Sequence, residues 1–259
     1  MVSLEDVRAR AQRFADERNW GQFHQPTSLL LALTGEVGEV AEIFQWRGRN
    51  FDVSTMSEED LVHSGEELAD VFIYATRLSQ QSNLDLAKCV IQMSRGTFPE
   101  TFDVRPLSSS GEWEREATFA WLFSGLSDLN PNPRFFCLRL CQQAGTLSSL
   151  FTSSPGNMEC ELGLENWTPA ELGSLGYTLA SLVITLTSLA KLLSLDLGEC
   201  IMRKMDKNEK KYPVAQSRGS SAKYTAYQGK TNLLQTASFA CGMLLLGVFL
   251  AKRLPSIKF

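Results

Sequence analysis

The sequence predicts an all-α protein. Apolar residues recur with the helical period in most segments, and residues typical of helix starts precede several of these segments. Proline, glycine and serine separate them, and no segment has the strict apolar–polar alternation of a strand. Hydrophobic residues make up 44% and charged residues 21% of the chain, which is typical of a globular protein with a packed core.

Four helices are expected in the N-terminal part of the chain. They cover residues 4–19, 28–46, 57–82 and 84–93. Thr27 or Ser28 is expected to cap the second helix, and residues 20–26 are an aromatic and polar connection too broken for regular structure. Ser108–Gly111 is the best linker candidate, and helices of the same kind follow it.

Two pairs of acidic residues are the most informative feature of these helices. Glu36 and Glu39 lie in the second helix, and Glu67 and Asp70 lie in the third. A spacing of three residues places each pair on one helix face, and the residue four positions after each acid is apolar or aromatic rather than basic. Convergent carboxylates without a local cation suit a hard divalent ion such as Mg²⁺. The alternative is two ordinary polar helix faces.

The second half of the sequence repeats the first. A shift of 107 residues places Pro133 on Pro26, and a shift of 111 residues places 195–197 on 84–86. The order of helices and apolar positions agrees throughout, which predicts two tandem repeats and a C-terminal tail. Their expected boundaries are 1–107, 108–227 and 228–259.

The second repeat lacks the acids. The corresponding positions carry Gln143, Thr146, Thr178 and Ser181, so only the first repeat is expected to hold a metal ion. The second repeat instead ends in a basic helix. Lys204, Asn208 and Lys211 fall on one face of it and are candidates for binding phosphate oxygens. The alternative is a solvated basic helix end, which the helix dipole favours.

Several motifs closely resemble the dCTP pyrophosphatase family. They are Phe23–Pro26 (FHQP), Gly35–Trp46 (GEVGEVAEIFQW), Glu66–Asp70 (EELAD) with Tyr74, and Lys204–Pro213 (KMDKNEKKYP). That family belongs to the all-α NTP pyrophosphohydrolases, which include MazG-like enzymes and dimeric dUTPases. The resemblance covers residues 1–105 and 190–227 well and is weak between them.

The resemblance implies hydrolysis of a deoxynucleoside triphosphate, dCTP or a modified dCTP, to the monophosphate and pyrophosphate. It implies Mg²⁺ held by Glu36, Glu39, Glu67 and Asp70, and Glu39 is the candidate for accepting the proton of the attacking water. The base preference stays undetermined. The residues that match the family's substrate pocket are Trp20, Gly21, Gln22, Phe23, His24, Trp46 and Tyr74, with Lys204, Asn208, Lys211 and Tyr212 at the basic end. For each aromatic residue alone, core packing is the alternative.

The chain departs from the family's single-copy organisation. We expect two MazG-like helical-bundle repeats that form a pseudo-dimer, with one composite site that takes metal ligands from the first repeat and phosphate ligands from the second. Assembly of two such chains is also expected. The alternative function is a catalytically inactive, membrane-tethered protein that binds nucleotides or acts as a scaffold, which the degenerate second repeat motivates.

Residues 233–251 form an uncharged stretch flanked by basic residues, long enough for a helix that crosses a bilayer. A final core helix is the alternative. The stretch predicts a tail anchor that leaves the catalytic part in the cytosol. The membrane would be the mitochondrial outer membrane, or that of the endoplasmic reticulum or the peroxisome. The formal net charge of −4 gives no sign of nucleic-acid binding. Six cysteines without a CxxC pair, with two histidines, argue against a zinc site.

Overall fold

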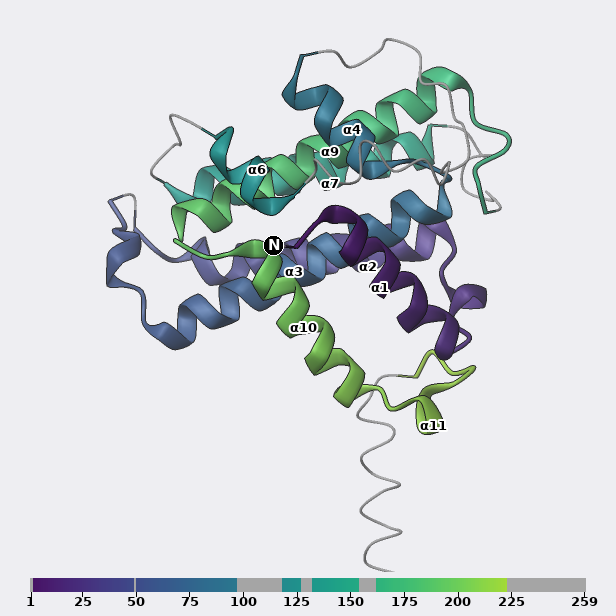
Figure 1. Ribbon diagram of the computed structural model, residues 1–259. Coiled ribbons are helices and arrows are strands. Elements are labelled where there is room, and N and C mark those ends of the chain that lie inside the picture. The colour runs from purple at the N-terminus through teal and green to yellow at the C-terminus, as the bar shows by residue number, and fades with distance from the viewer. Residues whose placement is uncertain (1, 49, 97–117, 127–131, 154–161, 223–259) are drawn as a thin grey trace, which may run out of the picture.

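The computed structural model is helical throughout the part of the chain that it describes, which comprises residues 2–48, 50–96, 118–126, 132–153 and 162–222 (Figure 1). These residues contain no strand, and a single isolated bridge joins Ser3 to Thr118. The all-α prediction is therefore confirmed for the described residues.

The helices of the N-terminal part begin close to the predicted residues. The α-helices are α1 (Leu4–Glu17), α2 (Pro26–Gln45), α3 (Glu58–Gln81) and α4 (Leu86–Ser94), with 3₁₀ turns η1 (Gly21–Phe23) and η2 (Val53–Thr55). Helix α1 ends early because Asn19 adopts a left-handed conformation with φ of 52°. The expected cap of α2 is wrong: the helix begins at Pro26, which fits the first helical position, and no side chain caps it. The segment expected to be irregular contains the turn η1.

The C-terminal part contributes five further described helices. They are α6 (Phe119–Ser124), α7 (Pro133–Thr152), α9 (Pro169–Leu192), α10 (Leu197–Lys211) and α11 (Val214–Ser217).

Helices in the two parts of the chain match in length and in the residues that end them. Helices α2 and α7 each contain 20 residues and begin with proline, and α3 and α9 each contain 24 residues. Asn83 after α3 and Ser194 after α9 both turn the chain with positive φ, at 54° and 57°. The next helices are capped alike, by Asp85 and Asp196, whose side chains each accept a hydrogen bond from the backbone three residues on.

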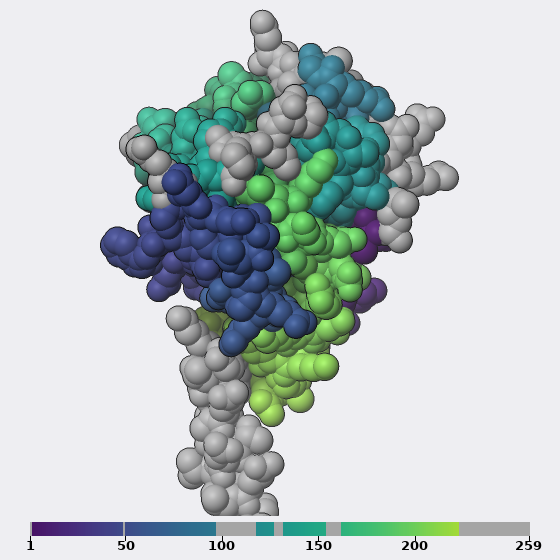
Figure 2. All heavy atoms as spheres, turned by 90° about the vertical axis from the view of Figure 1, so that its left-hand side faces the viewer, coloured from purple at the N-terminus to yellow at the C-terminus, as the bar shows by residue number. Residues whose placement is uncertain are grey.

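The helices pack so that the two parts of the chain are interleaved. Helix α2 packs on α3 and α7 packs on α9, while α2 and α7 also pack on each other. The shorter helices cross over: α4 packs on α9, and α10 packs on α3. Figure 2 shows residues of α3 and α10 side by side on one face of the molecule. Each part therefore completes the packing of the other.

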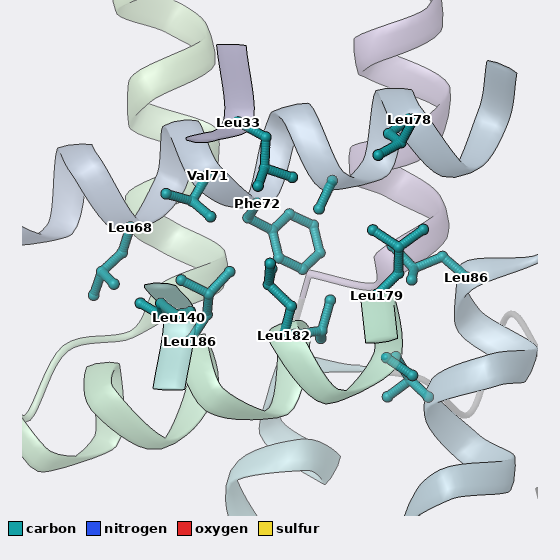
Figure 3. Packing of buried hydrophobic residues seen from close by; sticks show 14 of the residues in the cluster. Leu33, Leu68, Val71, Phe72, Leu78, Leu86, Leu140, Leu179, Leu182 and Leu186 are labelled. Atoms are coloured by element: carbon teal, nitrogen blue, oxygen red, sulfur yellow. The ribbon is translucent and has the colours of Figure 1, made fainter. Parts of the chain in front are cut away.

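One apolar core joins both parts of the chain. Figure 3 shows Phe72 of α3 at its centre, with Leu33 of α2 on one side and Leu182 of α9 on the other. These three side chains are fully buried, and leucines of α7 belong to the same cluster. Because burial of each such side chain contributes about 1.5–3 kcal/mol, the interface between the parts is a major source of stability.

Helices α3 and α10 approach closely at Gly65. A Cβ atom at this position would lie 2.8 Å from the Sγ of Cys200, so any larger residue requires the Cys200 side chain or α10 to shift. The absence of a side chain at Gly65 therefore allows α10 to lie close to α3, two residues before Glu67.

Among the described helices, only α9 is long and apolar enough to cross a membrane, and 78% of its most apolar window is buried inside the protein. This burial matches its place at the centre of the core. The predicted anchor at 233–251 lies outside the described residues.

Candidate metal centre and its surroundings

Three of the four predicted acids converge. Glu36 reaches from α2, and Glu67 and Asp70 reach from successive turns of α3, so the packing of α2 on α3 brings the two acidic pairs together. One carboxylate oxygen from each lies within 4.8 Å of the others. Glu67 is only 6% exposed, and the other two are half-buried. The two acidic pairs therefore contribute three carboxylates to one cluster.

The electrostatics of this cluster favour a cation. Burial, together with the charges of Asp70, Glu39 and Glu67, raises the pKa of Glu36 to about 7. Burial likewise raises the pKa of Glu67 and of Asp70. The Oε2 atom of Glu67 is buried and accepts no hydrogen bond within the described residues. A buried carboxylate oxygen without a hydrogen-bond donor, surrounded by other carboxylates, is a suitable ligand for a hard divalent cation.

Lys204 of α10 lies beside the acids. Its Nζ atom is 2.5 Å from Oδ2 of Asp70 and 3.9 Å from Oε2 of Glu66, and its side chain is only 10% exposed. Asn208, one turn later, also hydrogen-bonds the Asp70 side chain. A lysine and an asparagine from the end of the described chain therefore complete the surroundings of an acid from its beginning.

Glu39 does not belong to the converging trio. It lies one turn after Glu36 on α2 and is exposed, at the edge of the acidic cluster. Its charge nevertheless acts on Glu36 and Glu67. Because Glu39 is exposed, its carboxylate is in contact with solvent water. Its role as a proton acceptor stays a prediction.

The aromatic residues form a second cluster next to the acids. The ring of Trp20 meets Tyr212 edge-on at 5.2 Å and His24 at 6.1 Å, and its Nε1 donates a hydrogen bond to the backbone oxygen of Ser217 at 3.1 Å. Tyr74 lies between the clusters: burial raises its pKa, and the charges of Glu36 and Asp70 raise it further. Trp20, His24 and Tyr74 of the first part are therefore brought together with Tyr212 of the second.

The remaining predicted substrate residues are placed less uniformly. Gly21 and Gln22 are exposed on η1, and Phe23 is half-buried. Lys211 is exposed, with its ammonium group 5.7 Å from the centre of the Tyr212 ring. Trp46 is 89% exposed at the end of α2.

Trp46 lies apart from the other aromatic residues. It follows Glu36 by ten positions, which corresponds to about 15 Å along a helix. The structure of one chain does not bring it to the pocket, and its role in substrate binding stays a prediction.

The charged residue that the sequence reasoning missed is Arg77. It lies two turns after Asp70 on α3, is 3% exposed and donates hydrogen bonds to Nδ1 of His24. The sequence feature that could have revealed it is an arginine among the apolar residues of a largely buried helix. Such a cation needs hydrogen-bond partners from other elements.

The corresponding region of the C-terminal part is neutral. Nε2 of Gln143 donates to Oγ of Ser181 at 2.8 Å and to Oγ1 of Thr185 at 2.9 Å. The hydroxyl groups of Thr146 and Thr178 donate to backbone oxygens of their own helices. The acidic cluster found among the described residues is that of Glu36, Glu67 and Asp70.

Over its described residues, the fold and the site define an all-helical protein with a carboxylate cluster suited to a divalent cation and an aromatic cluster beside it. Comparison with known proteins relates this arrangement to one family. A segment of 90 residues, 34% of the chain, is 46% identical to the proteins named dCTP pyrophosphatase 1 of Rattus norvegicus and Homo sapiens, and 44% identical to that of Bos taurus.

These similarities support the dCTP pyrophosphatase family for the matched segment. The match covers 53% of each relative, so the chain spans about half the length of the curated relatives it matches. No family model matches the chain.

Proposed function

We propose that this protein is a Mg²⁺-dependent nucleoside triphosphate pyrophosphohydrolase that converts dCTP, or a modified dCTP, to the monophosphate and pyrophosphate. The observation that carries the proposal is the convergence of Glu36, Glu67 and Asp70 within 4.8 Å. The relatives' name, dCTP pyrophosphatase 1, supplies the substrate.

The residues present fit the reaction. Glu36, Glu67 and Asp70 would hold the ion, which when bound neutralises triphosphate charge and polarises the phosphoryl group. Water attacks the α-phosphorus, a new P–O bond forms, and the bond to the bridging oxygen of the β-phosphate breaks. Glu39 accepts the proton of that water, and Trp20 and Tyr212 offer aromatic surface for the base.

The site is proposed to be composite. Lys204 and Asn208 already contact Asp70, so α10 presents its polar groups at the point where the phosphates would lie. Two interleaved repeats in the manner of a pseudo-dimer explain this placement. The equal lengths of α2 and α7 and of α3 and α9, and the reciprocal packing of α4 and α10, support that organisation.

The same proposal includes a membrane tether and assembly of two chains. The uncharged stretch 233–251 supports the tether, and fusion of residues 228–259 to a fluorescent protein tests it. Recruitment of the fusion to an organelle membrane is the expected result, whereas a diffuse cytosolic signal would exclude the anchor. Light scattering of the purified protein tests the assembly, and a mass of one chain would exclude it.

The decisive experiment measures pyrophosphate release from each dNTP with Mg²⁺. We expect the fastest turnover with dCTP or a 5-substituted dCTP and a loss of about 100-fold or more in Glu67→Gln, which removes a buried ligand. Glu59→Gln, in the exposed first turn of α3, is the matched control and should keep full activity. Absence of turnover on every nucleotide, with nucleotide binding retained, would favour the non-catalytic scaffold instead.

A further inference from the structure

Arg77 is a buried cation whose hydrogen-bond partners are all neutral. Its Nη1 donates to Oε1 of Gln12 at 2.6 Å and to Oε1 of Gln80 at 2.8 Å. Its Nε and Nη2 lie 3.3 Å and 3.2 Å from Nδ1 of His24. Burial lowers the pKa of Arg77 to about 10, and Asp16 is the charge that offsets part of this shift. A cation buried in this way is unfavourable for folding, which points to a role in the site.

The contact determines which nitrogen of His24 carries the proton. A guanidinium group has only donors, so the Nδ1 atom that faces it must present its lone pair. The proton of the neutral ring is then on Nε2. Burial, with the charge of Arg77, lowers the pKa of His24 to about 4, so the ring is neutral at physiological pH. Nε2 makes no hydrogen bond within the described residues.

The position of His24 matches the base end of a nucleotide. Arg77 follows Asp70 by seven residues on α3, which is about 10 Å along the helix. That separation suits a nucleotide whose phosphates are at the acids and whose base is at His24. His24 also lies 6.1 Å from Trp20, which itself packs on Tyr212.

We propose that Arg77 is a positioning residue that holds His24 as an Nε2–H donor, and that this donor selects a base whose ring nitrogen N3 is a hydrogen-bond acceptor. N3 of cytosine is such an acceptor, whereas N3 of uracil and of thymine carries a hydrogen and would oppose the donor. The inference rests on the proposed function, because it assumes that the base lies against His24. A site built to match a substrate's hydrogen bonds rejects analogues that leave its buried polar groups unpaired.

The first test is spectroscopic and does not require turnover. The full-length chain labelled with ¹⁵N-histidine contains only two histidines, and His24→Gln assigns the signals. We expect Nδ1 and Nε2 shifts of the Nε2–H form in the wild type. In Arg77→Met the Nδ1–H form should become populated and the pKa of the ring should rise. Unchanged tautomer and pKa in Arg77→Met would overturn the role of Arg77.

The second test measures substrate preference. In Arg77→Met, His24 is free to turn an acceptor toward the base, so the ratio of kcat/KM for dCTP over dUTP should fall about tenfold, mainly through KM for dCTP. Arg77→Lys keeps a donor and should restore most of the ratio. Gln80→Leu removes a different partner of Arg77 and is the matched control, with the ratio unchanged.

The outcomes separate this inference from the proposed function. A wild-type enzyme without turnover would refute the function while the tautomer measurement still stands. A change of tautomer in Arg77→Met with an unchanged ratio would overturn selection by His24. An equal loss in Gln80→Leu and Arg77→Met would indicate packing alone and would also overturn the inference.

Discussion

The Nζ atom of Lys204 lies 2.5 Å from Oδ2 of Asp70, which joins the last long helix of the described chain to the acidic face of α3. Both groups are largely buried, so solvent screens their attraction less than it screens a surface ion pair. Lys204 also lowers the pKa of Glu36 and Glu67, although burial raises both by more. The acids of the first part therefore depend on a charge from the second.

Removal of that charge should impair turnover. We expect Lys204→Met to lower kcat/KM for dCTP about 30-fold or more, since a phosphate contact and the neutralisation of Asp70 are both lost. Lys207→Met is the matched control. Lys207 is exposed and pairs with Glu66 at 2.6 Å, and an exposed pair contributes little, so activity should change less than about threefold. Equal losses in the two variants would contradict the composite site.

The metal-free protein should lose stability as pH rises from 4.5 to 7. The pKa of Glu36 is about 7 in the folded chain and 4.5 ordinarily, so the folded state holds the proton across this window and the unfolded state does not. Above pH 7 the buried charge destabilises the fold by about 1–3 kcal/mol.

Glu36→Gln should remove the contribution of Glu36 to this effect. Urea unfolding in EDTA at pH 8 should show the variant to be more stable than the wild type, and the difference should shrink toward pH 4.5. A difference that does not depend on pH would contradict the assigned cause. Glu59→Gln, at an exposed position, is the control: its stability difference from the wild type should not depend on pH.

Addition of Mg²⁺ should reverse the destabilisation. A ligand that binds only the folded state at 100 times its Kd stabilises by about 2.7 kcal/mol. In a chain of this size that corresponds to a rise in Tm of about 5–10 °C. Calorimetry with Mg²⁺ and with EDTA measures it. Glu67→Gln should abolish the rise, and an undiminished rise in this variant would place the ion elsewhere.

The contact of α3 with α10 should be sensitive to one methyl group. Gly65→Ala would place a Cβ 2.8 Å from Cys200 Sγ, which should destabilise the protein by about 1–3 kcal/mol and weaken activity by shifting Lys204. Gly145→Ala in α7 is the control: nothing lies within 4 Å of its Cβ, and alanine favours a helix by about 0.5–1 kcal/mol. Thermal unfolding compares the two. A stable, fully active Gly65→Ala would refute the argument.

Much of this arrangement was predictable from the sequence because it depends on local periodicity. The spacing of Glu36, Glu67 and Asp70 placed each acid on a helix face, and two packed helices then bring the faces together. The replacement of the acids by Gln143 and Ser181 could be read from the sequence, whereas the hydrogen bond between these two side chains is seen only in the structure.

The rest depends on contacts between residues far apart in the chain. The sequence placed Arg77 on a helix but held no sign that His24 would face it, since that requires the path of η1. Trp46 is the converse case. Its place in a recognisable motif predicts a pocket residue, and in the structure of one chain it is 89% exposed directly after α2, so this role stays a prediction.

The crossing of α10 onto α3 has a consequence for synthesis on the ribosome. Residues 58–81 emerge long before residues 197–211, and at about 5–20 residues per second the interval lasts several seconds to tens of seconds. During that time the surface of α3 on which α10 packs is not covered by α10. The nascent protein therefore exposes this surface of α3 until residues 197–211 have been translated.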